Sequence, residues 1–264
     1  IKDYFRSADV EFDVRIVPED EPLGTGGALG NCRDVVSGRF ACFNGDIVSS
    51  LNVGEMLQQH SNMDVKGTLA LWEVDDPTRF GIVGLDEARK VTQFKEKPKP
   101  EEVFSNLINA GSYILEEEVF DIMPREKHSL ERDIFPVLAK EGSIAGFPFE
   151  GYFIDAGTPA SWHEGVSRCI AENRFKSGHV ENGSWHQGSV TSATNSMVQD
   201  GCVVLGTVSD STLLSGARIE SGAKVSNCLV GKGAIVQSGA ELRNVVVGHG
   251  VRVPAGHIQT EGTI

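Results

Sequence analysis

Two aspartates at the ends of short apolar runs are the first residues of this sequence whose type and spacing suggest chemistry. Asp46 closes the segment Phe43-Asn-Gly-Asp46, and Asp155 follows Tyr152-Phe-Ile. If both runs are strands of an open α/β sheet, the carboxylates lie outside the carboxyl ends of the strands, where such sheets bind ligands. Two carboxylates that meet there would chelate Mg²⁺, which prefers oxygen ligands and keeps several waters. A turn or helix-capping role is the alternative for Asp46.

Two further segments carry groups that suit a phosphate or a flat ring. Glu21-Pro-Leu-Gly-Thr-Gly-Gly-Ala-Leu29 is a glycine-rich turn before a predicted helix, and its bare backbone lets a ligand approach amide donors closely. Phe94-Lys-Glu-Lys-Pro98 places two cations and a carboxylate before a proline. Taken alone, the first segment also fits an ordinary turn, and the second fits a solvated run of charges.

The elements that must position these residues follow from the hydrophobic pattern. The apolar runs 40–44 and 67–74 predict buried strands. Apolar residues at helical spacing predict helices over 51–60, 129–140 and 159–170. Strands that alternate with helices predict an α/β sheet covered on both faces.

The last third of the chain repeats with a period of 17 residues. Aliphatic residues and glycines recur at that interval, as in Val208, Val225 and Leu242, in Leu213, Val230 and Val247, and in Gly216, Gly233 and Gly250. One inward aliphatic residue in about six, with small residues at the corners, is typical of a triangular β-solenoid. The pattern resembles the left-handed parallel β-helix built from hexapeptide repeats, over about residues 190–258.

Composition divides the chain between these two patterns. Of the 19 aromatic residues, Trp185 alone lies beyond residue 177. The tail from residue 178 instead carries 14 glycines and 14 valines in 87 residues. Because one core would not change composition so sharply, we predict an α/β domain over 1–177 and a β-helix over 178–264.

Charge and cysteine content exclude several classes of function. The 264 residues carry a net charge of −13, which argues against a nucleic-acid partner because Lys and Arg neutralise phosphates. No apolar run reaches the roughly 20 residues that cross a bilayer, so no membrane partner is expected. Five cysteines without a close pair predict reduced, buried thiols in the cytoplasm. The histidines other than His249, including His60, His128 and His186, are interpreted as surface or capping residues.

Taken in order, the segments resemble the sugar nucleotidyltransferases, also called NDP-sugar pyrophosphorylases, along nearly the whole chain. The motifs that carry the resemblance are the nucleobase loop Leu23-Gly-Thr-Gly-Gly-Ala28, the first metal-aspartate motif Asn44-Gly-Asp46, the sugar-phosphate motif Glu96-Lys-Pro98, the sugar-contacting strand Asn109-Ala-Gly111, the helix over 129–136 behind it, and the second metal-aspartate motif Asp155-Ala-Gly-Thr158. The resemblance implies a Rossmann-like nucleotidyltransferase domain followed by the left-handed β-helix.

The resemblance also implies a reaction and the residues that perform it. A sugar 1-phosphate attacks the α-phosphorus of a nucleoside triphosphate, forms a nucleotide-sugar and expels pyrophosphate. Both Asp46 and Asp155 would hold Mg²⁺, and Lys97 would bind the phosphate of the sugar as a point charge. The implied nucleotide-binding positions are Leu23, Gly24, Thr25, Gly26, Gly27 and Gly45, and the implied sugar-binding positions are Glu96, Asn109, Gly111 and Glu131.

The glycine-rich loop and the segment 43–46 bear on the choice of substrates. They are most similar to the branch that transfers guanylyl groups, which implies GTP and mannose 1-phosphate. Thymidylyl or uridylyl transfer to glucose 1-phosphate is the nearest alternative. A noncatalytic regulatory relative that binds nucleotide-sugar, and an acyltransferase with His249 as its base, are alternatives from other classes.

One motif of the family has no counterpart here. Its members open with a G-x-G-T-R loop that grips the triphosphate, and Ile1 corresponds to the region of their third strand. We therefore expect this sequence to be a fragment whose upstream part carries that loop. The flat, aliphatic-rich sides of the solenoid predict a homodimer or a higher closed oligomer.

Overall fold

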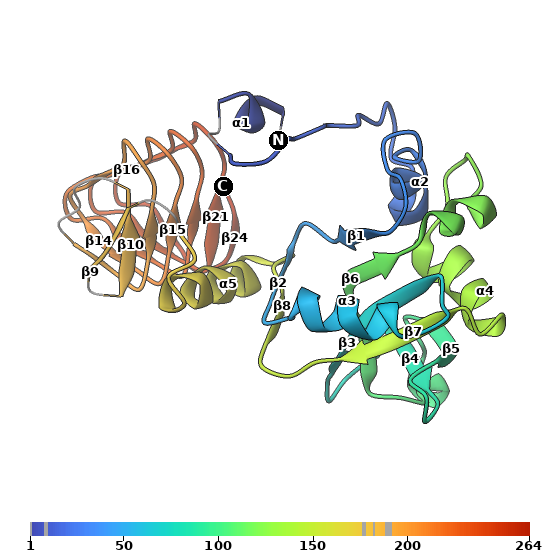
Figure 1. Ribbon diagram of the computed structural model, residues 1–264. Coiled ribbons are helices and arrows are strands. Elements are labelled where there is room, and N and C mark those ends of the chain that lie inside the picture. The colour runs from blue at the N-terminus through green and yellow to red at the C-terminus, as the bar shows by residue number, and fades with distance from the viewer. Residues whose placement is uncertain (1, 8–9, 176–177, 182, 188–191) are drawn as a thin grey trace. The chain divides into compact units, whose positions relative to one another are not determined.

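The structure, a computed structural model, describes residues 2–7, 10–175, 178–181, 183–187 and 192–264 (Figure 1). Its contacts divide the chain into two units, one formed by Ile1–Gly45 and Ser49–Phe153 and the other by Asp46–Val48 and Ile154–Ile264. The predicted domain boundary at 177/178 adjoins residues 176–177, which lie outside the described residues, so that boundary remains a prediction.

A mixed sheet forms the centre of the first unit. Its strands are β1 (Phe40–Phe43), β3 (Gly67–Glu73), β4 (Gly81–Leu85), β5 (Val91–Glu96), β6 (Leu107–Leu115) and β7 (Ile144–Pro148). The order is β5-β4-β6-β3-β7, and β1 also pairs with β6. Strand β6 is antiparallel to β1, β3 and β4, whereas β3 and β7 are parallel. Strands β1, β3 and β7 therefore point the same way, and the strands predicted at 40–44 and 67–74 are confirmed.

Helices cover both faces of this sheet, as the sequence predicts. The helical elements of the unit are α1 (Lys2–Ser7), α2 (Gly24–Gly30), α3 (Val53–Ser61), η1 (Pro100–Glu102), η2 (Glu117–Ile122), η3 (Leu130–Ile134) and α4 (Phe135–Lys140). Met56 of α3 shares a buried cluster with Ala70 of β3. Phe135 of α4 shares a different cluster with Leu69 of the same strand. Because successive strand residues point to opposite faces, the two clusters lie on the two sides of the sheet.

The helix predicted over 129–140 is interrupted. Ser129 caps it by accepting a hydrogen bond from the Arg132 N–H, and a π-helical turn over 130–134 follows before α4 begins. Pro136 has no N–H, so it cannot donate to the carbonyl four residues back. The preceding residue, Phe135, donates its N–H to the carbonyl of Leu130, five residues back, and this bond forms the π turn. Such single π turns are frequent at functional sites, and this one holds Glu131.

A two-stranded ladder and a helix precede the solenoid. Strand β2 (Ile47–Ser49) pairs with β8 (Phe153–Asp155). Helix α5 (Pro159–Ala171) begins after Thr158, whose hydroxyl accepts a 3.2 Å hydrogen bond from the Ser161 N–H. Pro159 occupies the first turn, where its missing N–H costs no hydrogen bond. The helix predicted over 159–170 is confirmed.

A parallel β-solenoid follows, preceded by the antiparallel pair β9–β10. One sheet holds β9 (His179–Glu181), β10 (Ser184–His186), β12 (Met197–Val198), β15 (Thr212–Leu213), β18 (Leu229–Val230), β21 (Val245–Val247) and β24 (Gly262–Thr263). The second holds β11 (Ala193–Thr194), β14 (Thr207–Ser209), β17 (Lys224–Ser226), β20 (Glu241–Arg243) and β23 (Ile258–Gln259). The third holds β13 (Val203–Val204), β16 (Arg218–Ile219), β19 (Ile235–Val236) and β22 (Arg252–Val253).

The register of the solenoid confirms the 17-residue repeat. Val225 pairs with both Val208 and Leu242, each 17 residues away. The preceding coil is shorter, because Val198 pairs with Leu213 only 15 residues later. The corners need left-handed backbone, which Asn227 (φ 51°) and Asn244 (φ 52°) adopt in successive coils.

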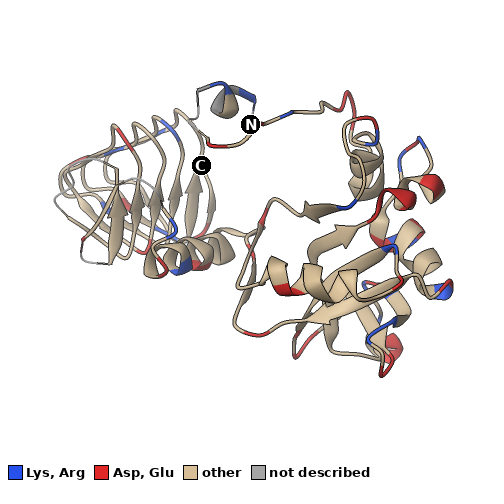
Figure 2. Cartoon of the chain, viewed as in Figure 1, with Lys and Arg blue, Asp and Glu red and all other residues tan. Residues whose placement is uncertain are grey.

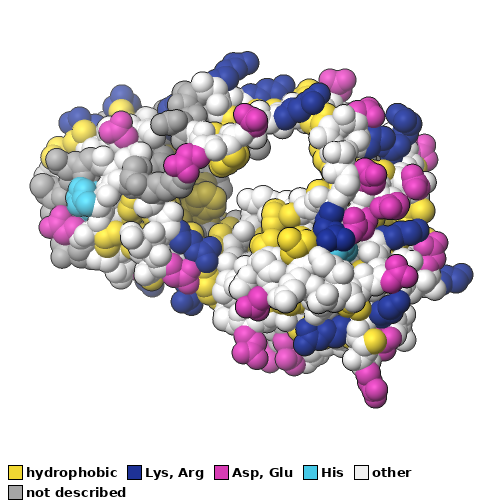
Figure 3. Space-filling view, viewed as in Figure 1, with side chains coloured by type: hydrophobic (Ala, Val, Ile, Leu, Met, Phe, Trp, Pro, Cys, Tyr) yellow, Lys and Arg dark blue, Asp and Glu magenta, His cyan; other side chains and the backbone are white. Residues whose placement is uncertain are grey.

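Most of the solenoid ribbon is uncharged, and its charged residues include Arg218, Lys224 and Glu241 on its strands (Figure 2). On the visible face of the first unit, basic and acidic side chains are interspersed (Figure 3). Among the described residues, no helix is long and apolar enough to cross a membrane.

Candidate functional site

The glycine-rich loop is held against the segment around His128. The backbone carbonyl of His128 accepts hydrogen bonds from the N–H groups of Gly26 (3.1 Å) and Gly27 (3.2 Å). The His128 N–H donates to the carbonyl of Leu23 (3.1 Å). A Cβ on Gly24 would lie 2.6 Å from the His128 carbonyl oxygen, so a side chain there would collide with this segment. Close packing of the chain on itself therefore requires glycine at position 24.

The side chain of Thr25 joins the same loop to η3. Its hydroxyl donates a 2.6 Å hydrogen bond to Oε2 of Glu131 and accepts one of 3.0 Å from the Leu130 N–H. The Ser129 hydroxyl donates to the same carboxylate oxygen at 2.7 Å. The structure thus brings a predicted nucleotide-binding residue, Thr25, into contact with a predicted sugar-binding residue, Glu131.

Glu96 is the last residue of β5, and Lys97 follows it directly. Burial raises the pKa of Glu96, and the negative charge of Glu131 raises it further, while Lys97 and Arg132 lower it. Glu96 therefore lies within electrostatic range of Glu131. Lys97 is exposed and has left-handed backbone (φ 46°), which costs a residue with a side chain about 1–2 kcal/mol. Strained backbone of this kind clusters at functional sites.

The predicted sugar-contacting residues lie on a bulge in β6. The register of β3 with β6 shifts between the Tyr113 and Asn109 pairs, and Gly111 lies at the shift with φ 64°. A Cβ on Gly111 would lie 2.7 Å from Nδ2 of Asn44, and the Gly111 carbonyl accepts a 2.8 Å hydrogen bond from the Asn44 N–H. The bulge in β6 therefore contacts Asn44, the residue that follows β1. Bulges often lie next to active sites, where they redirect side chains.

Asn109 and the Gly111 amide already have partners in the protein. The Gly111 N–H donates to Oδ1 of Asn109 at 3.2 Å, and Nδ2 of Asn109 donates to the Tyr113 hydroxyl at 2.9 Å. Tyr113 was not among the predicted site residues. It is fully buried, and burial, followed by the charge of Glu131, raises its pKa. Alternation along a strand was the signal that could have found it, because residues 109, 111 and 113 share a period of two.

The two predicted metal ligands meet at neighbouring strand ends. Asp46 directly precedes β2, Asp155 ends β8, and the Asp46 carbonyl accepts a 2.9 Å hydrogen bond from the Ala156 N–H. Both side chains are exposed, and Oδ1 of Asp155 accepts a 3.1 Å hydrogen bond from the Gly157 N–H. Two exposed carboxylates on paired strands offer the oxygen donors that a hard divalent cation prefers. The described residues contain no group of three or more His, Cys, Asp or Glu side chains placed to hold a metal.

Gly45 and Lys97 complete the predicted set. A Cβ on Gly45 would meet nothing within 4 Å among the described residues, so no packing contact there requires glycine. Lys97 belongs to the first unit, whereas Asp46 and Asp155 belong to the second.

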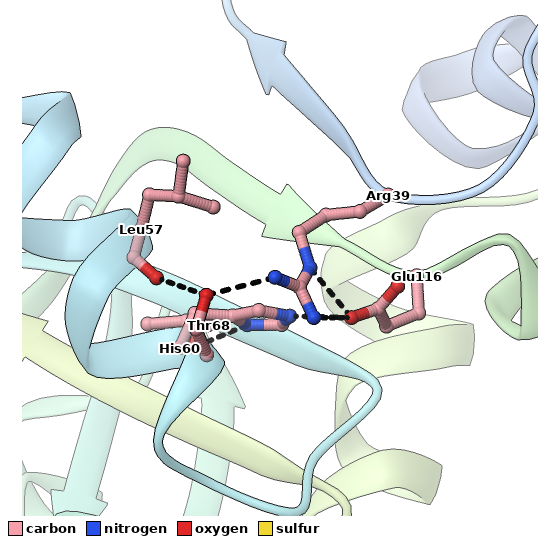
Figure 4. Close-up of polar contacts among 6 residues, drawn as sticks. Arg39, Leu57, His60, Thr68 and Glu116 are labelled. Carbon is pink, nitrogen blue, oxygen red and sulfur yellow. Dashed lines mark hydrogen bonds and ion pairs between the residues drawn. The ribbon is translucent and has the colours of Figure 1, made fainter.

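The interpretation of the histidines as surface or capping residues is wrong for His60, His128 and His186, which are 1%, 7% and 3% exposed. Nδ1 of His60 is 2.8 Å from the Thr68 hydroxyl, and its Nε2 is 3.1 Å from Oε1 of Glu116 (Figure 4). Arg39 donates to the same Glu116 oxygen at 2.7 Å. These contacts form a network of residues 39, 60, 68 and 116. The network links the segment before β1 to α3 and to the residue that follows β6. Isolated histidines gave no sequence pattern that distinguishes a buried network from a surface position.

The cysteine prediction is confirmed in part. All five cysteines are free thiols, but only Cys228 is fully buried, and the other four are half-buried.

Comparison with known proteins identifies both parts of the chain. The family described as "Nucleotidyl transferase" matches residues 1–172, and the family described as "GlmU-like, C-terminal hexapeptide" matches residues 182–259. Mannose-1-phosphate guanylyltransferase of Mycobacterium tuberculosis (strain ATCC 25618 / H37Rv) is 33% identical over 82% of this chain and 62% of its own length. Mannose-1-phosphate guanylyltransferase 1 of Arabidopsis thaliana is 30% identical over 87% of this chain and 63% of its own length. The chain thus spans less than two thirds of these curated relatives.

A solved structure supports the same assignment. HddC from Yersinia pseudotuberculosis, complexed with GMP-PN, is 29% identical and superposes with a TM-score of 0.53 over 63% of this chain and 72% of that one. With one family matched over 172 residues and the hexapeptide repeat matched beyond it, this chain belongs to the nucleotidyl transferase family, among the sugar nucleotidyltransferases that carry a C-terminal β-solenoid.

Proposed function

We propose that this protein transfers a nucleotidyl group from a nucleoside triphosphate to a sugar 1-phosphate and releases pyrophosphate. We further propose GTP and mannose 1-phosphate as the substrates, because curated relatives at about 30% identity are named mannose-1-phosphate guanylyltransferases. The observation that carries the proposal is the contact of Thr25 with Glu131, which joins the glycine-rich loop to the residues around Glu96.

The nucleotide is proposed to bind at Leu23, Gly24, Thr25, Gly26, Gly27 and Gly45. The N–H groups of Gly26 and Gly27 are already bonded to His128, and the Thr25 hydroxyl is bonded to Glu131 and Leu130. The remaining backbone groups of the loop are therefore the donors and acceptors proposed for the base edge. A base that leaves one of these groups unpaired in a closed site would lose about 1–3 kcal/mol of binding.

The sugar 1-phosphate is proposed to bind at Glu96, Asn109, Gly111 and Glu131, with Lys97 on its phosphate. The two carboxylates suit acceptance of hydrogen bonds from sugar hydroxyls. Lys97 is exposed, and its ammonium suits a phosphate as a point charge. Since a phosphate nucleophile is already ionised at neutral pH, no general base is needed, and positioning with charge neutralisation supplies most of the catalysis.

Nucleotidyltransferases of this family generally use divalent metal ions, and we propose Mg²⁺ held by Asp46 and Asp155. A bound Mg²⁺ would supply Lewis-acid stabilisation and a template for phosphate oxygens. The aspartates contribute two negative charges and oxygen donors from paired strand ends.

The acyltransferase alternative loses support from the position of His249. Its Nδ1 accepts a 2.9 Å hydrogen bond from the Lys232 N–H one coil earlier, as expected of a turn residue. The noncatalytic regulatory relative and transfer of thymidylyl or uridylyl groups to glucose 1-phosphate remain as outcomes of the test below.

Three further proposals concern the setting of the protein. Free thiols at all five cysteines favour the reducing cytoplasm. The domain division is proposed at 177/178, between the two family matches. The solenoid is proposed to mediate a homodimer or a higher closed oligomer.

The test is a matrix of nucleoside triphosphates against sugar 1-phosphates with Mg²⁺, scored by pyrophosphate release. The proposal expects the fastest release with GTP and mannose 1-phosphate, and none when either substrate is omitted. Faster pyrophosphate release with dTTP or UTP and glucose 1-phosphate would identify that pair as the substrates in place of GTP and mannose 1-phosphate. No release from any pair, together with saturable binding of GDP-mannose, would favour the noncatalytic relative.

A further inference from the structure

His128 is a buried histidine to which the reaction proposed above assigns no role. Its side chain is tied to its own segment, since Nδ1 is 2.8 Å from the carbonyl oxygen of Glu126. A carbonyl can only accept, so Nδ1 carries the hydrogen in this contact. Nε2 is buried and has no hydrogen-bond partner among the described residues.

The ring of His128 lies directly against the glycine-rich loop. A Cβ on Gly26 would lie 2.6 Å from Nε2, and one on Gly30 would lie 3.7 Å from Cε1. The backbone of His128 binds the same loop on both sides of Gly26 through Leu23 and Gly27. One residue therefore contacts this loop through its carbonyl, its N–H and its ring.

We propose that His128 is a positioning residue that sets the conformation of the glycine-rich loop and thereby the affinity for the nucleotide. Substitution by any residue other than proline changes only the side-chain part of this contact, because the backbone hydrogen bonds do not involve the side chain. The ring fills the space beside Gly26 and excludes any side chain there. The inference rests on the proposed function for its effect on nucleotide binding, but not for its effect on the loop.

A double-mutant cycle between positions 26 and 128 tests the inference. Gly26→Ala should weaken nucleotide binding strongly, because the added methyl group collides with the ring. In a His128→Ala background the space is open, so the double variant should regain about tenfold or more of the affinity lost in Gly26→Ala alone. Equal losses from Gly26→Ala in both backgrounds would overturn the proposal.

Kinetics separate positioning from a merely structural role. His128→Ala should raise the KM for the nucleotide by about tenfold while kcat changes less than about twofold. His128→Asn should restore most of the affinity, because its amide can still donate to the Glu126 carbonyl. A lowered melting temperature with unchanged KM in His128→Ala would reduce the residue to a structural one and contradict the proposal.

Hydrogen exchange tests the loop itself, whether or not the protein is an enzyme. His128→Ala should speed exchange of the amides of residues 25–30 at least about tenfold, and His128→Asn should not. The matched control is His60→Ala, which removes another buried histidine of the same unit but one bonded to Thr68 and Glu116. Unchanged exchange in His128→Ala overturns the positioning role. Faster exchange with no nucleotide binding by the wild type would instead reject the proposed function alone.

Discussion

The hydroxyl of Thr25 donates a 2.6 Å hydrogen bond to Oε2 of Glu131, 106 residues further along the chain. The contact fastens the glycine-rich loop to the π-helical turn of η3. Because Glu131 also raises the pKa of Glu96, the same carboxylate influences a residue proposed to bind the sugar. A single acidic side chain thereby relates the two proposed substrate sites of the first unit.

Removing this bond should weaken nucleotide binding. A hydrogen bond to a charged group contributes about 1.5–3 kcal/mol. Solvent reduces this contribution here because Thr25 is exposed, so we expect Thr25→Val to raise the KM for the nucleotide by only about threefold to tenfold. Thr25→Ser keeps the hydroxyl and should behave like the wild type. Steady-state kinetics at saturating sugar 1-phosphate give the comparison, and a wild-type KM in Thr25→Val would remove the contact from the site.

The aspartate pair should be essential for turnover but not for folding. Asp46→Asn and Asp155→Asn should each lower kcat by about a thousandfold or more, because a metal that stabilises the transition state supplies several kcal/mol. Both side chains are exposed, so the melting temperature should stay near that of the wild type. Asp75→Asn, also exposed, is the matched control. Turnover within tenfold of the wild type in either variant would exclude that residue as a ligand.

Lys97 should act on one substrate only. Lys97→Gln should raise the KM for the sugar 1-phosphate by about tenfold to a hundredfold and leave the KM for the nucleotide unchanged, since the lost contact is charged. Glutamine meets the same left-handed backbone as lysine, so folding is unaffected. Lys140→Gln, exposed at the end of α4, is the control. Equal changes in both KM values would contradict a role on the sugar phosphate.

Acid should destabilise the protein partly through His60. Burial lowers the pKa of His60, and the hydrogen bond to Glu116 opposes this only in part. Between the lowered value and the ordinary 6.5, the unfolded chain binds a proton that the folded chain does not, so stability falls as the pH drops below about 6.5. His60→Gln removes the part of this pH-dependent loss of stability that comes from His60. The loss in urea midpoint from about pH 8 to about pH 5.5 should therefore be smaller in the variant than in the wild type.

Other titratable groups also make the stability of the wild type and of the His60→Gln variant depend on pH. Burial lowers the pKa of His163 and of His186 as well, so the wild type and the variant keep a common acid dependence. Burial alone would raise the pKa of Glu116, but its bonds with Arg39 and His60 lower it, so its own contribution is lost only at more acidic pH. An identical midpoint shift in wild type and variant would contradict the assignment to His60.

The solenoid corners should tolerate glycine but not a branched side chain. Asn244 has φ 52° and its Oδ1 accepts a 2.6 Å hydrogen bond from Nδ2 of Asn227 in the coil before. Asn244→Val should cost about 1–2 kcal/mol from the left-handed backbone in addition to the lost bond. Asn244→Gly loses only the bond and should be the more stable variant by urea unfolding. Equal stability of the two would argue against left-handed backbone at this corner.

The sequence predicted most successfully where a pattern repeats or a motif is local. The 17-residue period fixes the pairing of Val208, Val225 and Leu242, because parallel coils stack equivalent residues. It did not predict the 15-residue coil from Val198 to Leu213, which occurs once and has no repeat to reveal it.

The site was predicted less completely, for physical reasons that particular residues make plain. Asp46 and Asp155 were singled out because each follows an apolar run, and their role as metal ligands stays a prediction. Tyr113 and His128 were missed because their partners depend on a strand bulge and on a contact between residues about 100 apart. The π turn before Pro136 was also missed, because the spacing of apolar residues does not distinguish a hydrogen bond to the fifth residue back from one to the fourth.

The most direct measurement of the central claim follows the α-phosphorus of the nucleotide. The protein is incubated with GTP labelled at the α-phosphate, mannose 1-phosphate and Mg²⁺, and the products are separated. The account predicts that the label enters GDP-mannose in equal amount to the pyrophosphate released, and that Asp46→Asn abolishes both. Label recovered in GMP or GDP, at a rate that does not depend on the sugar 1-phosphate, would contradict it.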